Sequence, residues 1–381
     1  MDRSGKIRSI WNRLLLEDVI APIFMQMLLG VQELIGPINS YYSLWPKGSF
    51  EEPWSILVEH IYKNIGNSAV LYSDLGGGKW VSPVEAFLHD EEFGKSKELA
   101  EALLQLGMPI VHLPNYLFDM FLKYGTDFQQ KVVTPDTVRH FLRLCKSLMS
   151  LSKSYKLVLL EYCLEDLIDA DVGTYANNLS LIPLANGDFG LFSEGTKGVS
   201  YFVCNELEYM LLQQISDRII DRTIPLNILS RLSAIARSSK ANLAVFSVQH
   251  FVKLFPRFVP AEWRCKSKVL WEPESSCTYP TKSWFVLFWQ YIQNQREGLS
   301  MFGDWPILPS ISGHLYRPSR QSKLIKAEKL SDSMRDILVK IGCKILDAAY
   351  GVEHPDLSHY VSDSNFSGVL ESIFDIVSYC K

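Results

Sequence analysis

The chain has 381 residues, a length that predicts two or three domains of ordinary size. Hydrophobic residues make up 47% of it and charged residues 21%, which is typical of a globular protein and excludes a disordered or collagen-like chain. Lys and Arg number 38 and Asp and Glu number 42, so the net charge is −4. This balance does not favour binding to nucleic acid or to an anionic membrane through the overall charge of the chain.

The spacing of the cysteines and the length of the apolar segments bear on the cellular location of the protein. No two of the seven cysteines stand in a CxxC spacing, and most have apolar neighbours, as in reduced and buried thiols. The longest apolar stretch, residues 14–38, is broken by charged residues, glutamines and a proline, so it is not a membrane span. The first residues have no signal-peptide pattern. The thiols indicate a cytosolic or nuclear protein, and we expect a cytoplasmic one that makes no membrane contact.

Residues 1–53 are predicted to form an N-terminal helical segment followed by an aromatic linker. The expected helix, residues 10–29, is apolar over a wider arc than a surface helix needs. One face of this arc carries Leu14, Leu15, Val19, Ile23 and Met27, and the adjacent face carries Leu16, Ile20, Phe24 and Leu28. We expect the arc as a whole to be exposed and to cause self-association of the chain. The aromatic run from Tyr41 to Pro46 is expected to be non-helical and to pack across a domain joint rather than to stack on a ligand.

Three later segments carry the same order of signals, which we interpret as an internal repeat of helix, hairpin, helix and strand. The hairpins are predicted at residues 70–81, 181–192 and 307–316, with Gly77, Gly187 and Gly313 in their turns. The flanking helices are predicted at 54–65, 155–167 and 284–292 before the hairpins and at 98–106, 207–215 and 334–341 after them. Short strands follow at 109–111, 218–220 and 344–346. Gly107 and Gly342 stand where left-handed glycines end helices, and the second segment has Ser216 instead.

The predicted fold is therefore a mixed α+β fold of three repeated helix–hairpin–helix–strand units joined by helical connectors. The connectors are residues 116–123, 137–151, 228–236 and 248–255. Unit 1 with its connector spans 54–150, unit 2 with its connector 151–263, and unit 3, interpreted as truncated, 284–381. Residues 264–283 break the helical periodicity with prolines, serines and threonines, so we predict a loop or insertion there.

Two glycine-rich patterns invite a nucleotide-binding interpretation. Residues 74–78 match the DxGxG box of the GHKL ATPases, but no helix presenting a Glu and an Asn to magnesium precedes Asp74. The equivalent places in the other repeats are ordinary turns, so a hairpin turn is the preferred interpretation. Lys79 is followed by Trp80 rather than by the Ser or Thr of a phosphate loop. We expect no cofactor.

Other chemistry-bearing residues are weighed in the same way. His354, Asp356 and His359 could suggest a metal site, but the spacing of the histidines and Pro355 favour a solvated loop. The acidic residues after His89 could act as acid and base, but acids at this position more often cap a helix. No Ser-His-Asp or Cys-His pattern is visible. We predict no catalytic residues, no metal and no enzymatic activity.

A basic stretch follows the third hairpin and is the one candidate contact site. It consists of Arg317, Arg320, Lys323, Lys326 and Lys329, with Glu328 as its single acid. Such a stretch could contact an anion or an acidic partner, and the alternative is a solvated edge. A nucleic-acid contact here is the weaker third interpretation, because the net charge of the chain is negative.

Several phrases resemble the sacsin family, most of all the plant sacsin-like proteins. They are residues 11–20 (WNRLLLEDVI), 42–46 (YSLWP), 78–83 (GKWVSP) and 182–187 (IPLANG), and the resemblance runs from residue 7 to residue 374. Sacsins are very large proteins of a few long repeats, each beginning with an ATP-binding module similar to that of the ninety-kilodalton heat-shock chaperones. The resemblance implies that this chain is a fragment corresponding to the region directly after that module.

The resemblance implies a function without site residues, because no residue of the ATP site can be carried over onto this sequence. The first hypothesis is a non-catalytic part of a chaperone repeat, which holds client or partner proteins or contacts other modules of a full-length protein. The alternative is a structural scaffold in which repeated βα units present surfaces for assembly, without chaperone activity.

Overall fold

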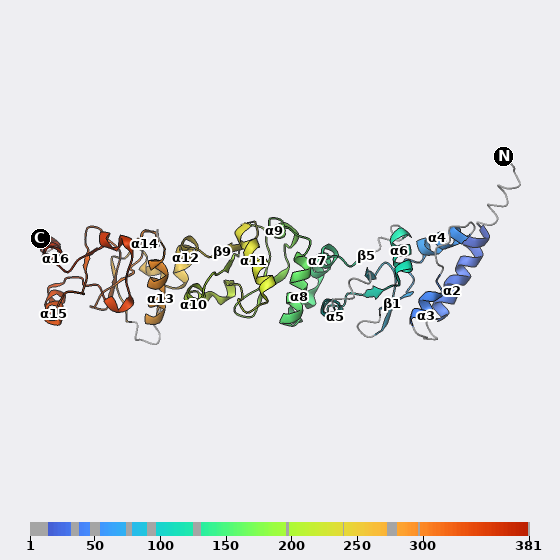
Figure 1. Cartoon of the computed structure of the whole chain (residues 1–381), viewed down its shortest axis with the longest axis horizontal. Helices are drawn as coiled ribbons and strands as arrows, with labels where there is room; N and C mark the ends of the chain where they lie inside the picture. The colour runs from blue at the N-terminus through green and yellow to red at the C-terminus, as the bar shows by residue number, and fades with distance from the viewer. Residues whose placement is uncertain are drawn as a thin grey trace, which may run out of the picture. The chain divides into compact units, whose positions relative to one another are not determined.

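The computed structural model describes residues 14–31, 38–45, 54–73, 78–89, 97–124, 131–195, 198–238, 240–272, 280–295 and 298–379. These residues form a mixed α+β fold with several small sheets, as predicted (Figure 1). Two compact units are distinguished by their contacts. The first contains residues 1–183, 189–197 and 224–229, and the second contains 184–188, 198–223 and 230–381. The predicted boundaries concern repeats rather than compact units, and they stay a prediction.

The first compact unit contains mostly helices with short strands between them. Its elements are η1 (Leu16–Ile20), α2 (Ala21–Val31), α3 (Ile38–Ser43), α4 (Trp54–Asn64), β1 (Leu71–Ser73), β2 (Lys79–Val81), β3 (Phe87–His89), α5 (Lys97–Gln105), β4 (Ile110–His112), α6 (Asn115–Tyr124), β5 (Lys131–Val132), α7 (Pro135–Leu144), η5 (Lys146–Ser150), α8 (Lys153–Leu164), α9 (Val172–Tyr175), β6 (Ser180–Pro183) and β7 (Phe189–Leu191).

The second compact unit has the same character. Its elements are β8 (Ser200–Phe202), α10 (Glu206–Leu211), η6 (Gln213–Arg218), β9 (Leu243–Val245), α12 (Val248–Leu254), η7 (Phe255–Arg257), η8 (Ala261–Trp263), β10 (Lys268–Leu270), α13 (Lys282–Gln293), α14 (Gly298–Met301), β11 (Leu308–Pro309), β12 (His314–Tyr316), β13 (Leu324–Ile325), α15 (Asp332–Ile341), η9 (Ala348–Tyr350), η10 (Pro355–His359), β14 (Val361–Ser362) and α16 (Phe366–Tyr379). Helix α11 (Leu226–Ser238) contributes residues to both units.

The same strand pairing occurs at three places in the chain. Strand β3 pairs in parallel with β4 and β5. Strand β8 pairs in parallel with β9, and its Tyr201 also forms a parallel bridge with Ile219. In the same way β13 pairs in parallel with β14, and its Ile325 forms a parallel bridge with Ile345. Each arrangement follows an antiparallel hairpin, formed by β1–β2, β6–β7 or β11–β12. The superposition of whole repeats stays a prediction.

Hydroxyl side chains and glycines set several helix ends. Ser152, Thr281 and Ser331 stand at the N-caps of α8, α13 and α15, where each accepts a hydrogen bond from the backbone amide three residues on. Helix α15 ends at Gly342, whose φ of 102° lies in the left-handed region that glycine adopts at little cost. These signals explain why the sequence predicts these helices well.

Three local expectations differ from the structure. Tyr41 and Tyr42 lie in α3, not in a non-helical segment, and they pack into the core of the first unit. The helix expected at 207–215 ends at Leu211 and continues as the 3₁₀ segment η6, in which Ile215 has non-helical dihedrals. Strand β10 lies inside the predicted loop 264–283 and pairs with β12. The turn at 74–77 lies outside the described residues.

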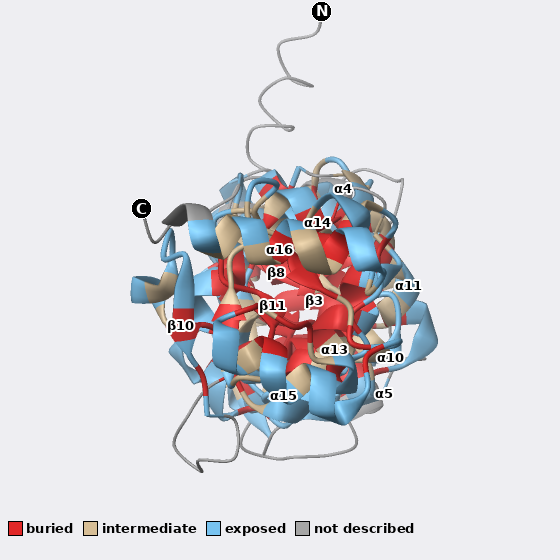
Figure 2. Cartoon of the chain, turned by 90° about the vertical axis from the view of Figure 1, so that its left-hand side faces the viewer, coloured by how far each residue is buried: buried red, intermediate tan, exposed pale blue. Residues whose placement is uncertain are grey.

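Aromatic side chains fill both main cores. In the first unit Trp45, Tyr62 and Phe121 contact one another edge-on or tilted, and Tyr41 donates a hydrogen bond to the Val70 carbonyl at 2.9 Å. In the second unit Phe251, Phe255 and Trp284 belong to a larger cluster that includes most of α13. Figure 2 shows the buried residues, including those of β3, β8 and β11, in red. Among the described residues, no helix is long and apolar enough to span a bilayer.

Candidate functional site

The basic stretch begins where β12 ends and continues past β13. Arg317 directly follows β12, and its guanidinium donates a hydrogen bond to the Cys265 carbonyl at 3.3 Å. Lys326 forms an ion pair with Asp363, its Nζ lying 3.4 Å from Oδ1. Both cations therefore have a partner within the protein, which weakens their role in an external contact.

The remaining cations of the stretch are more open. Arg320 and Lys329 are exposed and Lys323 is half-buried. Among the residues that the structure describes, neither Arg320 nor Lys323 has an ion-pair partner. Two of the five predicted residues are thus engaged within the fold, and the other three lie outside the strands, Arg320 and Lys323 before β13 and Lys329 after it.

The structure brings a further lysine to this region that the sequence did not indicate. Lys344 directly precedes Ile345, which forms a parallel β-bridge with Ile325. The Lys344 Nζ donates a hydrogen bond to Ser322 Oγ at 2.5 Å and lies 5.1 Å from the centre of the Tyr316 ring. Lys268 stands directly opposite Tyr316 in the register of β10 and β12. Sheet pairing places these cations beside one another although they are far apart in sequence.

Electrostatics at Lys344 reflects this neighbourhood. Burial lowers the pKa of the Lys344 ammonium, the charge of Lys268 lowers it further, and Asp375 acts in the opposite direction. An anion bound beside a partly desolvated lysine stabilises the charged form of that lysine, especially where a second cation lies near. Lys268, Tyr316, Ser322 and Lys344 thus offer donors to a carboxylate or another oxyanion, which would have to compete with the negative charge of Asp375.

The other residues singled out in the sequence fit structural roles. His354 is buried, its Nε2 lies 2.9 Å from the Gln295 carbonyl, and its Nδ1 accepts from the Asp356 amide at 3.0 Å. Both ring nitrogens are thus occupied. The predicted solvated loop is wrong for His354, which is buried at the start of the 3₁₀ segment η10, whereas His359 is exposed. No group of three His, Cys, Asp or Glu residues with metal-binding geometry occurs in the described ranges. Residues 74–77 and 90–92 lie outside those ranges.

An exposed apolar face is the other candidate contact surface, and it lies on η1 and α2. Leu14, Leu15, Val19, Ile23 and Met27 are all exposed, with Ile23 at 61%. On the adjacent side Leu28 is buried, and Ile20 and Phe24 are partly buried against the core of the first unit. The predicted exposure of the arc is therefore right for the first face and wrong for the adjacent face, which packs on the core.

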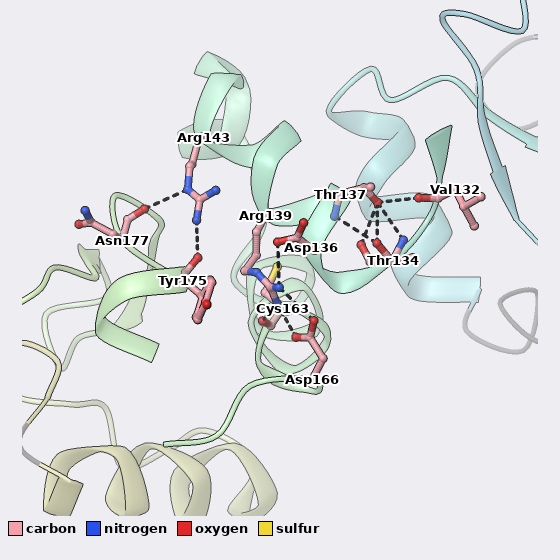
Figure 3. A network of polar contacts seen from close by, with 10 residues as sticks. All are labelled: Val132, Thr134, Asp136, Thr137, Arg139, Arg143, Cys163, Asp166, Tyr175 and Asn177. Carbon is pink, nitrogen blue, oxygen red and sulfur yellow. Dashed lines mark hydrogen bonds and ion pairs between the residues drawn. The ribbon is translucent and has the colours of Figure 1, made fainter. Parts of the chain in front are cut away.

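A polar network in the first unit, drawn in Figure 3, ties α7 to the end of α8. Arg139 is only 2% exposed and donates hydrogen bonds to Asp166 at 2.5 and 3.0 Å, to Asp136 at 3.1 Å and to the Cys163 carbonyl at 2.8 Å. Arg143, one turn later, donates to the carbonyls of Tyr175 and Asn177. Because every acceptor lies within the unit, this network stabilises the fold rather than forming an open site.

The chain resembles one curated protein over most of its length. Human Sacsin is 24% identical over 400 aligned residues, which cover 95% of this chain and 8% of Sacsin. The chain thus spans a small part of the relative it matches. No family model and no solved structure matches the chain. The comparison supports a sacsin-like relationship and does not assign residues to a site.

Proposed function

We propose that this chain is a non-catalytic part of a sacsin-like chaperone repeat that holds client or partner proteins in the cytoplasm. The observation that carries the proposal is the similarity to human Sacsin over 95% of the chain. The exposed apolar face of η1 and α2 supports it, because exposed apolar patches beyond a few hundred Å² are typical of protein-binding surfaces. In this proposal the chain is a fragment, most similar to plant sacsin-like proteins, and an ATP-binding module precedes it in the full-length protein.

The chain is proposed to bind no nucleotide by itself. Calorimetric titration with Mg-ATP should give no heat, because the sequence before Asp74 contains no helix with the magnesium-binding Glu and Asn. Micromolar binding that disappears in Asp74→Ala would contradict this. The basic surface around Lys344 is proposed as a secondary contact for acidic segments of a partner.

An aggregation assay tests the chaperone function. The chain should suppress light scattering of a heat-denatured model client, and the double variant Ile23→Gln, Met27→Gln should suppress it less, because both side chains are exposed on α2. Leu144→Gln is the matched control, since Leu144 is an exposed apolar residue at the end of α7. Suppression that is equal in all three chains would show that the α2 face is not the client surface.

The recurring strand pairing favours the structural scaffold as a second candidate. A chain that has no effect on client aggregation, yet associates with purified neighbouring modules of a sacsin-like protein, would support the scaffold and exclude the chaperone function.

A further inference from the structure

Helix α15 carries an exposed apolar face. Met334, Ile337 and Ile341 follow one another at helical spacing and are 46–53% exposed. Leu338, on the neighbouring side, is 2% exposed and packs with Ile325 and other residues of a small core. The helix therefore already buries one side in its own unit, and the three apolar residues beside it are not needed for that contact.

The repeat supplies a direct comparison for this face. Helices α5 and α15 both lead into a left-handed glycine, Gly107 and Gly342, which aligns them residue by residue. The counterparts of the three exposed residues in α5 and the following turn are Leu99, Ala102 and Leu106. All three are 7% exposed or less. The counterpart of Leu338 is Leu103, which is also buried.

The middle repeat agrees with the first. Ser216 takes the place of the glycine, and Asn205 and Ser331 occupy matching N-caps. The corresponding residues of α10 and η6 are Glu208, Leu211 and Ile215. These are again 7% exposed or less. Two of the three repeats thus bury a face that α15 leaves open.

In the first and second repeats, a helix in the same position of the chain covers this face. Helix α8 packs against α5, and α13 packs against α10. Tyr155, the third residue of α8, donates its hydroxyl to Glu101 at 3.0 Å, and Trp284, the third residue of α13, donates its indole N–H to the Leu211 carbonyl at 3.0 Å. Each covering helix is the one that begins the next repeat.

No such helix covers α15 in the part of the chain that the structure describes. In the first two repeats the parallel strand is followed by a connecting helix, α7 or α12, and later by the covering helix, α8 or α13. In the third repeat β14 is followed by α16, whose Val369 and Ile373 pack against the α15 core. Most of α15 is coloured as exposed in Figure 2. Asp336, the counterpart of Glu101, offers a carboxylate beside the open face.

We propose that Met334, Ile337 and Ile341 form a docking face for the first helix of a further repeat unit. The occupant is an amphipathic helix with Ser or Thr at its N-cap and an aromatic hydrogen-bond donor at its third position. The relative's length supports this occupant, since the chain matches only 8% of Sacsin. The proposal rests on the repeat comparison and is independent of client binding, so failure of the aggregation assay would leave it untouched.

The segment 152–166, which contains α8, serves as the probe. We would join a second copy of it to the end of the 381-residue chain through a flexible Gly/Ser linker, and also add it as a free labelled peptide. The joined copy should raise the thermal unfolding midpoint by about 3 °C or more, because a short linker gives an effective concentration on the order of millimolar. The free peptide should bind saturably.

Substitutions on α15 decide whether the face is the site. Ile337→Gln with Ile341→Gln should weaken binding of the free peptide by about tenfold or more and abolish the rise in midpoint, because each buried isoleucine contributes to docking. Ile168→Gln with Leu226→Gln is the control, since both are exposed apolar residues that lie outside α15. All four residues are exposed, so the variants should fold.

Three outcomes would overturn the proposal. The first is binding that is equal in the two double variants. The second is the absence of both peptide binding and a midpoint shift. The third is a concentration-dependent dimer of the unmodified chain, measured by sedimentation, that the Ile337→Gln, Ile341→Gln variant loses while the peptide does not bind. That result would assign the face to a second copy of the chain.

Discussion

Arg139 is buried and yet charged, because two carboxylates and a carbonyl surround its guanidinium. Burial acts to lower its pKa, but the hydrogen bonds and charges of Asp166 and Asp136 outweigh this and raise it. The two carboxylates are not equivalent. Asp166 binds both terminal nitrogens and is 41% exposed, whereas Asp136 makes one contact and is 73% exposed. Most of the stabilisation should therefore come from Asp166.

Truncation of the two acids tests this difference. Asp166→Ala should lower the free energy of unfolding by about 3 kcal/mol, because it removes the main partner of a buried charge. Asp136→Ala should cost less than about 1 kcal/mol, as exposed ion pairs do. Urea unfolding followed by circular dichroism measures both. Equal losses in the two variants would contradict the assignment.

Low pH should weaken the ion pair between Arg139 and Asp166 and so lower the stability of the protein. The hydrogen bond from Arg139 lowers the pKa of Asp166 in the folded protein, below the value of about 3.9 expected in the unfolded chain. Its contribution to stability is therefore complete above that value and is lost as the pH falls through the folded-state pKa. The free energy of unfolding should fall below about pH 4, and Asp166→Asn should reduce this slope more than Asp136→Asn does. Unfolding curves across that range measure it.

At the scale of the element, two hairpin turns depend on left-handed glycines. Gly187 and Gly313 have φ values of 90° and 75°, and a methyl group added to either would meet no atom within 4 Å. Any cost of substitution must therefore come from the backbone conformation and not from a clash. The turn of the first hairpin lies outside the described residues, so the comparison rests on these two.

Alanine at these turns should destabilise the protein. Gly187→Ala and Gly313→Ala should each lower the free energy of unfolding by about 1–2 kcal/mol. Gly30→Ala is the control, because Gly30 lies in α2 without a positive φ or a close neighbour. It should leave stability unchanged or raise it by up to about 1 kcal/mol. Turn variants as stable as the unmodified chain would show that the hairpins tolerate other turn types.

Local signals explain which elements the sequence could predict. Hydroxyl N-caps, apolar periodicity and turn glycines act within a few residues, so α8, α13, α15 and the hairpins were predicted close to their observed bounds. Helix α3 has only six residues, too few for a period, and its aromatic side chains are fixed by contacts such as that of Tyr41 with Val70. Strand β10 exists because β12 offers it a free edge, which no local pattern reveals.

The candidate surfaces were predictable to different degrees for the same reason. The helical pattern of residues 10–29 predicts which apolar side chains share a face, and the structure exposes one of the two predicted faces and covers the other. The basic stretch was visible as a sequence run, but Lys326 turned out to be paired, and Lys344 joined the region through sheet pairing. The sequence alone did not predict these contacts, because they join residues that are distant in sequence.

At the scale of the whole molecule, the exposed apolar face of η1 and α2 should control solution behaviour. The chain should self-associate at concentrations on the order of tens of micromolar, as partly exposed apolar surfaces do. Ile23→Gln with Met27→Gln should reduce this, whereas Ile337→Gln with Ile341→Gln should not, because those residues lie on α15. Light scattering measures the mass. A monodisperse monomer of the unmodified chain would contradict the prediction.

The parallel strand pairing at three places in the chain has a consequence for how the protein is made. Strand β3 pairs in parallel with β4 and β5. Strand β8 pairs with Ile219 and β9, and β13 pairs with Ile345 and β14. Every partner lies a short way further along the chain, so closing these loops costs little entropy. On a translating ribosome the earliest set of strands can thus be complete while the latest is still being synthesised.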